Sequence, residues 1–209
     1  LAPPAVLLDG ALGKDLASGA VFHRAAFTVA DAGAVLDAFE QAGLSPCVYV
    51  ERPDVDVVVG DAPSTHPAHL DAIGRWLARG DLRAVVDGEP VLSFCIAGRD
   101  DPRFAAVAAT VTGVAEVVVT RDLSYGASAL TVRPRGVTKW RGVEAYCRWT
   151  GLDASRVLAV GDGDNDLELL AGARVACVVS DGCEAALSLA DHVIEPAAEG
   201  GWCAVLDLC

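Results

Sequence analysis

Residues 161–166 read GDGDND, so three carboxylates and one amide are packed into one short segment, here called the acidic loop. Carboxylates this close together repel one another unless a cation offsets their charge. Hard oxygen ligands of this kind favour Mg²⁺, which proteins hold with one or two carboxylates together with oxygens of a phosphate substrate. The acidic loop therefore predicts a magnesium site beside a phosphorylated ligand.

The acidic loop lies between an expected strand and an expected helix. Residues 156–160 form a short apolar run of strand type, and residues 167–170 have helical spacing. In an open parallel sheet, ligands bind at the carboxyl ends of the strands, and a helix that begins there offers free backbone N–H groups. This position supports the prediction of a binding site.

Two other interpretations of the acidic loop stay open. Asp162, Asp164 and Asp166 have the spacing of the first ligands of a calcium loop. That loop needs Gly at its sixth position and Glu at its twelfth, where this chain has Leu167 and Ala173. The second interpretation is a cluster of helix-capping residues without a metal, because Asp and Asn are common N-caps.

Alternating strands and helices in the last third of the chain predict a parallel sheet covered on both faces. Residues from about 128 onward are expected to form one β-α-β-α-β-α-β unit. Its strands are predicted at residues 128–133, 156–160, 174–179 and 192–194, and its helices at 138–150, 167–170 and 181–190, with a terminal helix after it at 201–208.

The earlier part of the chain mixes paired strands with helices, which is typical of an α+β layer with an antiparallel sheet. A strand at residues 4–8 is followed by an Asp9-Gly10 turn. Further strands are predicted at residues 45–50, 54–59, 84–86, 91–97 and 116–120, and helices at 31–42, 67–78 and 101–112.

The composition excludes several classes of protein. The formal net charge of −13 repels phosphate backbones, so no nucleic-acid partner is expected. Apolar runs are shorter than a membrane span, so no membrane association is expected either. The seven cysteines include no C-x-x-C pair and mostly lie in apolar runs, which favours buried thiols in a reducing cytoplasm over disulfides or zinc ligands.

In its acidic loop and the segments around it, the chain resembles the haloacid dehalogenase (HAD) superfamily, in its Cof-type phosphatase branch with a C2-type α+β cap. The G-D-x-x-N-D loop of that family is matched by Gly161, Asp162, Asn165 and Asp166. The family's lysine, which follows a strand and turn and opens a helix, is matched by Lys139. Residues 9–11 (DGA) resemble the N-G-A turn that leads into the cap, and residues 190–193 and 199–201 resemble the closing strand and helix.

The resemblance implies an α/β fold: a partial, Rossmann-like HAD core with a parallel sheet and an inserted α+β cap domain. Residues 1–13 would be a core strand and the hinge into the cap, residues 14–126 the cap, and residues 127–209 the C-terminal part of the core. The implied reaction is Mg²⁺-dependent hydrolysis of a small phosphate monoester, such as a sugar phosphate or a phosphorylated cofactor, through an aspartyl-phosphate intermediate.

The resemblance also implies roles for single residues. Lys139 would hold the phosphate and act in catalysis, and Asn165 would contact the phosphate. Asp162 would bind Mg²⁺, and Asp166 would orient the loop or a metal-bound water and so serve both the metal and catalysis. Asp164 lies at a variable position of the motif. For Lys139 there is independent support, because a cation at a helix N-terminus is slightly unfavourable unless an anion lies nearby.

The nucleophile of the family, in a D-x-D-G-T motif, and its second-motif Ser or Thr have no match here. Residues 7–12 (LLDGAL) are superficially similar to D-x-D-G-T-L, but Leu7 would then occupy the position of the nucleophile. The N-G-A interpretation is favoured, and the nucleophile is then expected outside this sequence. The chain begins with Leu and contains no Met, which agrees with a missing upstream segment.

Three functions are therefore compared: a phosphatase whose N-terminal segment is not included, a truncated or non-catalytic HAD-like binding protein, and a small-molecule binding protein of another α/β class. Activity that depends on Mg²⁺ would distinguish the first from the others. Four residues of the expected cap could line the entrance to the site, with ordinary surface positions as the alternative: Glu51, Arg52, His66 and His69. The sequence does not determine the oligomeric state.

Overall fold

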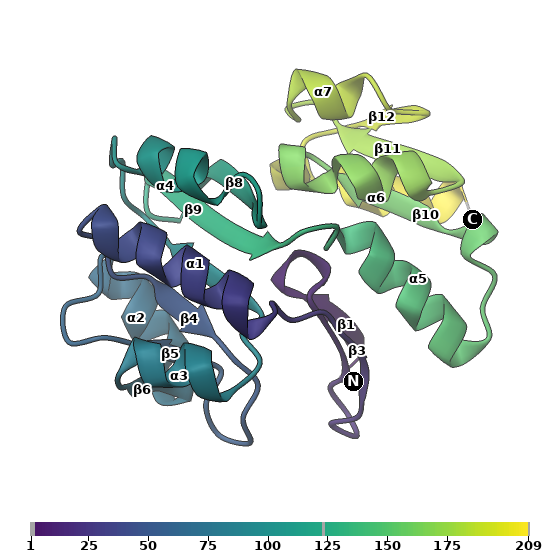
Figure 1. Ribbon diagram of the computed structural model, residues 1–209. Helices are drawn as coiled ribbons and strands as arrows, with labels where there is room; N and C mark the ends of the chain where they lie inside the picture. Colours follow the sequence, from purple (N-terminus) through teal and green to yellow (C-terminus); the bar gives the residue numbers. More distant parts are fainter. Residues whose placement is uncertain (1–2, 123, 209) are drawn as a thin grey trace. The chain divides into compact units, whose positions relative to one another are not determined.

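The computed structural model describes residues 3–122 and 124–208, and the chain divides into two compact units (Figure 1). The middle unit contains Arg24–Gly136, and the terminal unit contains Leu1–His23 together with Val137–Cys209. Residues 1, 2, 123 and 209 lie outside the described residues. The predicted segments 1–13, 14–126 and 127–209 are therefore each described only in part.

The middle unit is built on a six-stranded sheet with the order β6-β5-β4-β7-β9-β8. Neighbouring strands are antiparallel except for β5 and β6, which are parallel. The strands are β4 (Cys47–Tyr49), β5 (Val57–Val59), β6 (Leu77–Arg79), β7 (Ser93–Ile96), β8 (Ala115–Asp122) and β9 (Ala127–Pro134). The predicted α+β layer with a largely antiparallel sheet is therefore present.

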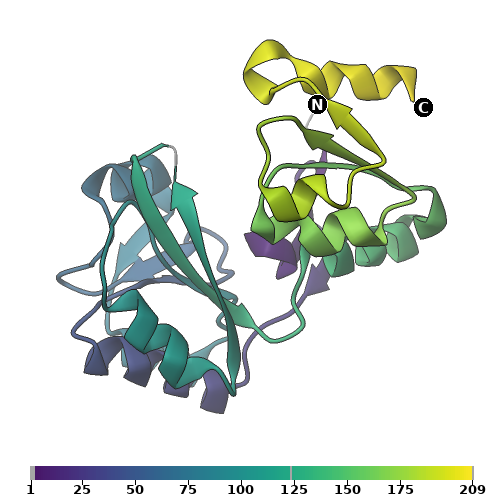
Figure 2. The ribbon, with the colours of Figure 1, turned by 90° about the horizontal axis from the view of Figure 1, so that it is seen from above.

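Helices cover both faces of this sheet unequally (Figure 2). On one face, α1 (Val29–Gln41), α3 (Leu82–Gly88) and α4 (Phe104–Val111) share a continuous apolar core with alternate residues of the strands. On the other face, α2 (Pro67–Ile73) packs Leu70 and Ile73 over β4 and β5. Successive side chains of a strand point to opposite faces of the sheet, so alternate residues of one strand, β7 among them, face different layers.

The terminal unit contains two small sheets of three strands each. The first, in the order β10-β11-β12, is parallel throughout and consists of β10 (Leu158–Gly161), β11 (Val175–Val179) and β12 (His192–Ile194). The second has the order β1-β2-β3 and consists of β1 (Pro4–Leu7), β2 (Leu12–Asp15) and β3 (Val21–Arg24). The helices are α5 (Lys139–Thr150), α6 (Leu167–Gly172) and α7 (Glu184–Leu187).

Apolar residues lie on both faces of the parallel sheet. Ala159, Ala176 and Val178 pack with residues of α6 and α7 on one face. Cys177, Val179 and Ile194 lie on the other, where Val205 of the 3₁₀ helix η6 (Gly201–Asp207) packs against them. The predicted α/β class, with a parallel sheet covered on both faces, is confirmed.

Three predicted elements of the chain were wrong. Residues 84–86 were expected to form a strand but lie in α3, whose N-cap Asp81 accepts hydrogen bonds from the backbone N–H groups of Arg83 and Ala84. The predicted helix at residues 67–78 ends at Ile73, because Gly74 takes a positive φ of 58°, and its last residues form β6. The strand at residues 128–133 belongs to the middle unit as β9, not to the parallel sheet.

Other differences are ones of extent. The predicted helix at residues 181–190 is helical only over Glu184–Leu187, and the terminal helix is of the 3₁₀ type. Strands β2 and β3 were not anticipated. In the described part of the chain, every helix is too short or too polar to cross a membrane.

Candidate functional site

The acidic loop follows β10 at the carboxyl end of the parallel sheet. Gly161 is the last residue of β10, the 3₁₀ turn η4 (Asp164–Asp166) comes next, and α6 begins at Leu167. A Cβ atom at Gly161 would lie 2.8 Å from Cβ of Asp166, so glycine is required for the loop to fold back this closely. The predicted strand–loop–helix arrangement is therefore present.

Asp166 is the centre of the hydrogen bonds in the loop. Lys139 Nζ donates to Asp166 Oδ1 over 2.6 Å. The backbone N–H groups of Asp162 and Gly163 both donate to Asp166 Oδ2, over 3.1 and 3.4 Å. Asp166 is buried, with 6% of its surface exposed. Both of its carboxylate oxygens are thus engaged by groups that hold the loop to the start of α5.

Lys139 is the first residue of α5, which Thr138 caps by accepting a hydrogen bond from the backbone N–H of Arg141. The structure brings Lys139 and Asp166 together although 27 positions separate them in the sequence. A cation at this helix start has an anionic partner, which was the condition for a role of Lys139 in the site.

The two carboxyl groups of the loop have pKa shifts of opposite sign. Burial acts to raise the pKa of Asp166, but the hydrogen bond from Lys139 and those from the loop backbone outweigh it, so the pKa lies below its ordinary value. Partial desolvation, then the neighbouring Asp166 and more weakly Asp181, raise the pKa of Asp162. Lys139 offsets only part of this effect. The surroundings of Asp162 therefore disfavour its ionised form.

A divalent cation fits the surroundings of Asp162. Partial burial and the neighbouring Asp166 disfavour the charge of Asp162, and Mg²⁺ would offset that charge with only one or two protein carboxylates. In residues 3–122 and 124–208, three or more His, Cys, Asp or Glu side chains are nowhere clustered as a complete metal site. The loop thus offers the carboxylate of Asp162, with the hydrogen-bonded carboxylate of Asp166 beside it. This arrangement suits a hydrated ion that also binds oxygens of the substrate.

Asn165 faces a residue that sequence reasoning placed only in a turn. Asn165 Nδ2 donates to Asp9 Oδ1 over 3.3 Å, which joins the acidic loop to the turn η1 (Leu8–Gly10). That turn connects β1 and β2 into an antiparallel hairpin. In the described residues, the strand before the Asp9-Gly10 turn belongs to this hairpin and not to the parallel sheet.

Asp164, to which the sequence assigned no role, lies next to a cysteine. Cys183 Sγ is 3.5 Å from Asp164 Oδ1, and the backbone N–H of Cys183 donates to the carbonyl oxygen of Asp162 over 2.8 Å. Cys183 also caps α7. The start of α7 therefore also holds the acidic loop in place.

The four candidate residues of the expected cap all lie in the middle unit. Two of them are in surface ion pairs: Glu51 with Arg24, and Arg52 with Glu89.

The histidines His66 and His69 lie with tyrosines. The ring of His66 stacks on Tyr125, and His69 joins the hydroxyls of Tyr49 and Tyr125 through its two ring nitrogens, over 3.1 and 3.2 Å. Burial lowers the pKa of His69, whose ring lies between the two hydroxyls. These contacts show ordinary structural partners for all four residues.

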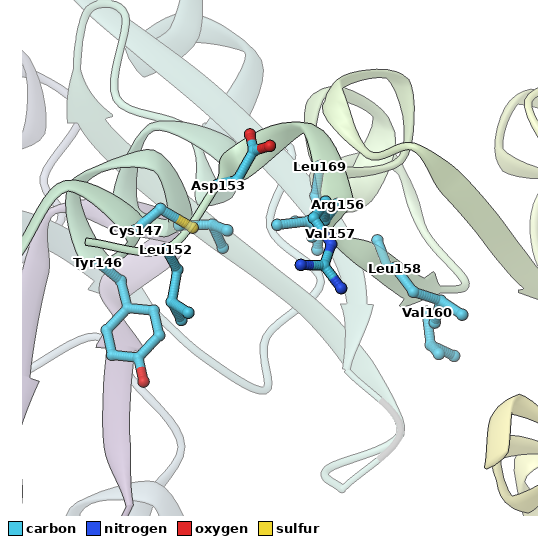
Figure 3. A pocket seen from close by; sticks show the side chains of 11 residues that line it. Tyr146, Cys147, Leu152, Asp153, Arg156, Val157, Leu158, Val160 and Leu169 are labelled. Atoms are coloured by element: carbon cyan, nitrogen blue, oxygen red, sulfur yellow. The ribbon is translucent and has the colours of Figure 1, made fainter. Parts of the chain in front are cut away.

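A cavity of about 630 Å³ lies in the terminal unit between residues of α5, β10 and α6, and the acidic loop does not line it (Figure 3). Leu158 and Val160 of β10, with Tyr146 and Cys147 of α5 and Leu152 after it, form much of the lining, and Asp153 and Arg156 add charge. β10 pairs with β11 and is the edge strand of its sheet in the described residues. The cavity thus follows an open strand edge.

The chain matches known proteins along most of its length. Residues 3–206 match the family model described as haloacid dehalogenase-like hydrolase. A phosphoglycolate phosphatase of Halorubrum lacusprofundi is 31% identical over 131 residues, which are 63% of this chain and 54% of that protein. The chain spans only part of the length of the curated relatives that it matches, from 11% to 54% in three of them.

Solved structures show the same fold. A HAD subclass IIB sugar phosphatase superposes with a TM-score of 0.75 at 19% identity, over 98% of this chain and 75% of that one. A HAD phosphatase from Bacteroides thetaiotaomicron superposes with a TM-score of 0.73 at 19% identity, over 98% of this chain and 73% of that one. Because the family model extends over nearly the whole sequence, the chain belongs to the haloacid dehalogenase-like hydrolase family.

Proposed function

We propose that this chain forms the metal- and phosphate-binding part of a Mg²⁺-dependent phosphatase that acts on a small phosphate monoester. The observation that carries the proposal is the arrangement of Lys139, Asp166 and Asp162 at the carboxyl end of β10. It supplies a cation, an engaged carboxylate and an available carboxylate within one loop and one helix start. Family membership and the phosphatase names of the relatives support the reaction class.

Each side chain receives the role that its contacts allow. Asp162, whose carboxylate is exposed, binds the metal directly. Asp166 has both oxygens engaged, so it holds the loop and Lys139 in place and acts on the metal through water. Lys139 and the amide of Asn165 bind the phosphate oxygens. The magnesium ion would supply positive charge to offset the charge that develops on those oxygens.

The attacking carboxylate comes, in this proposal, from polypeptide outside this sequence. In the described residues β10 is an edge strand, so a further strand can pair with it, and residues of β10 also line the cavity (Figure 3). An aspartate at the end of such a strand would lie near Asp162 and Lys139. The alternative is a HAD-like binding protein that holds metal and phosphate without turnover.

The middle unit, Arg24–Gly136, serves in this proposal as the cap, although the sequence placed the cap at residues 14–126. An α+β unit inserted between the hairpin of the terminal unit and α5 fits that role. The substrate class is a small phosphate ester such as a sugar phosphate, in keeping with the name of one structural relative.

The test uses the full-length protein with p-nitrophenyl phosphate as substrate and Mg²⁺ as the varied ion. Asp162→Ala is expected to abolish the Mg²⁺-dependent activity, and Lys139→Ala to lower turnover about a hundredfold or more, because an electrostatic stabiliser is lost. Lys14→Ala is the matched control, because Lys14 lies in the hairpin strand β2. Wild-type activity in Asp162→Ala would refute the assignment.

A second measurement separates the two functions. The thermal midpoint of the terminal unit should rise with Mg²⁺ in both, because a ligand that binds only the folded state stabilises it. Hydrolysis should occur only with the phosphatase. Binding of Mg²⁺ without hydrolysis by the full-length protein would favour the non-catalytic alternative.

A further inference from the structure

The turn between β1 and β2 adopts an unusual backbone conformation. Leu8 and Asp9 have φ values of 52° and 51°, and they are the described non-glycine residues with positive φ. This left-handed region disfavours residues with a side chain, Leu more than Asp, and strain of this kind is kept where the surroundings determine it. Something other than local preference must therefore hold the turn.

Gly10 shows what holds it. A Cβ atom at Gly10 would lie 2.0 Å from the carbonyl oxygen of Thr138, and φ of Gly10 is 107°. The backbone of the turn is thus pressed against the residue that precedes Lys139 and caps α5. Asp9 is one residue away from this contact, and its position is fixed relative to the start of α5.

On its other side, Asp9 reaches the acidic loop. Asp9 Oδ1 accepts a hydrogen bond from Asn165 Nδ2 over 3.3 Å. An ionised carboxylate can only accept hydrogen bonds, so it selects the Nδ2 end of the Asn165 amide and excludes the carbonyl end. An asparagine at position 9, as in the N-G-A turn that this segment resembles, could donate or accept and would allow both orientations of Asn165.

We propose that Asp9 is a positioning residue that fixes the orientation of the Asn165 amide, so that its second Nδ2 hydrogen faces the phosphate. The inference rests on the proposed function. Asp9 acts through Asn165, and the contact between Gly10 and Thr138 holds both in a fixed relation to Lys139. The turn before the middle unit is thereby part of the phosphate site, and not only a connection between strands.

The variant Asp9→Gly removes the side chain and keeps a residue that accepts positive φ, so the turn is expected to fold. Asp9→Asn keeps the shape but lets position 9 donate as well as accept. Asp15→Asn is the matched control, because Asp15 lies in the same hairpin and bonds only locally, to Ser18 and the backbone of Ala17, among its described contacts.

The first readout is the NMR signal of the Asn165 side-chain amide in this chain, which needs no activity. In the wild type, one Nδ2 proton should be shifted and protected from exchange. Asp9→Gly should remove the protection, Asp9→Asn should give two amide environments, and Asp15→Asn should change neither. An unchanged Asn165 signal in Asp9→Gly would overturn the inference even if the proposed function holds.

The second readout is a double-mutant cycle in the full-length protein with p-nitrophenyl phosphate. Asp9→Gly should raise KM about threefold to tenfold, the scale of one net hydrogen bond, because the Asn165 amide loses its fixed orientation, with a smaller change in kcat. In an Asn165→Ala background, Asp9→Gly should have little further effect, because the two residues act as one. Additive effects would show that Asp9 acts on the metal or substrate directly and would overturn the positioning role. If the wild-type protein shows the protected Asn165 amide but no phosphatase activity, the proposed function fails while the contact between Asp9 and Asn165 stands.

Discussion

The two units of the chain differ in how they are stabilised. In the middle unit, large side chains such as Phe39, Phe94 and Leu130 are fully buried in one continuous core. In the terminal unit, the parallel sheet is covered by two small clusters made mainly of Ala, Val, Cys and Leu. The terminal unit also contains the buried carboxylate Asp166, the left-handed turn at Leu8 and Asp9, and the open edge of β10.

The candidate site thus lies in the unit with the smaller buried clusters. Left-handed backbone in residues with a side chain costs free energy, and among the described residues it occurs at Leu8 and Asp9, in the unit with the thinner core. The unit with the larger core also contains a buried charge, Arg133, but ion pairs such as Arg83 with Asp37 lie at its surface and contribute little. We therefore expect the terminal unit to open first under denaturant.

The largest expected effect is that of truncating the core of the middle unit. Phe94→Ala should lower the free energy of unfolding of that unit by about 3–5 kcal/mol, because Phe94 is fully buried and contacts the rings of Phe27 and Phe39. Hydrogen exchange followed by mass spectrometry measures each unit separately. Leu170→Ala, in the smaller cluster of the terminal unit, is the matched comparison, with an expected loss of about 2–3 kcal/mol.

Equal losses for Phe94→Ala and Leu170→Ala would contradict the difference between the two cores. So would a loss of protection in the terminal unit that accompanies Phe94→Ala, because it would show that the units unfold together.

An intermediate effect concerns charge in the acidic loop. The lowered pKa of Asp166 means that its ionised form stabilises the folded state above the ordinary carboxyl pKa of 3.8, and that this contribution is lost as the pH falls through the lowered value. Asp166→Asn should therefore cost about 2 kcal/mol at neutral pH, because a hydrogen bond from a charged group to a buried acceptor is weakened.

Asp162→Asn should have the opposite sign. The raised pKa of Asp162 means that ionisation destabilises the folded state, and this penalty is present at neutral pH and disappears as the pH falls below 3.8, where the carboxyl is protonated in both states. Because Asp162 is exposed, the gain should be small, about 0.5 kcal/mol or less without Mg²⁺. Urea denaturation at pH 7 and pH 3, with and without Mg²⁺, measures both variants, and losses of the same sign would contradict the assignment of the shifts.

Local patterns in the sequence were enough to predict the acidic loop. The apolar run before residue 161 and the helical spacing after it correctly placed the loop at the end of a strand and the start of a helix. Lys139 was expected to need an anionic partner, and its hydrogen bond to Asp166 supplies one. Which of the two carboxylates is engaged could not be predicted, because it depends on how the loop backbone folds onto Asp166.

The errors arose where tertiary contacts outweigh local preference. The β-branched run Val85-Val86 favours a strand, but Asp81 caps a helix there and the two valines enter the core of the middle unit. Residues 128–133 alternate like any strand, and only pairing with β7 and β8 assigns them to the middle unit. The contact between Asp9 and Asn165 joins residues 156 positions apart, and neither the Asp-Gly turn signal nor the resemblance to an N-G-A turn indicated it.

The smallest expected effect concerns the open edge of β10. Leu152 lines the cavity there and is 58% exposed, so Leu152→Ser should change the free energy of unfolding by less than about 0.5 kcal/mol. It should nevertheless weaken the binding of the dye 8-anilinonaphthalene-1-sulfonate, because that dye binds accessible apolar surface and the cavity offers such a surface. Val119→Ser is the control: Val119, in the middle unit, is 51% exposed and lies outside the lining of this cavity. If both variants reduce dye fluorescence equally, the cavity beside β10 is no more accessible to apolar ligands than ordinary surface. The terminal unit would then not differ from the middle unit in accessible apolar surface at this edge.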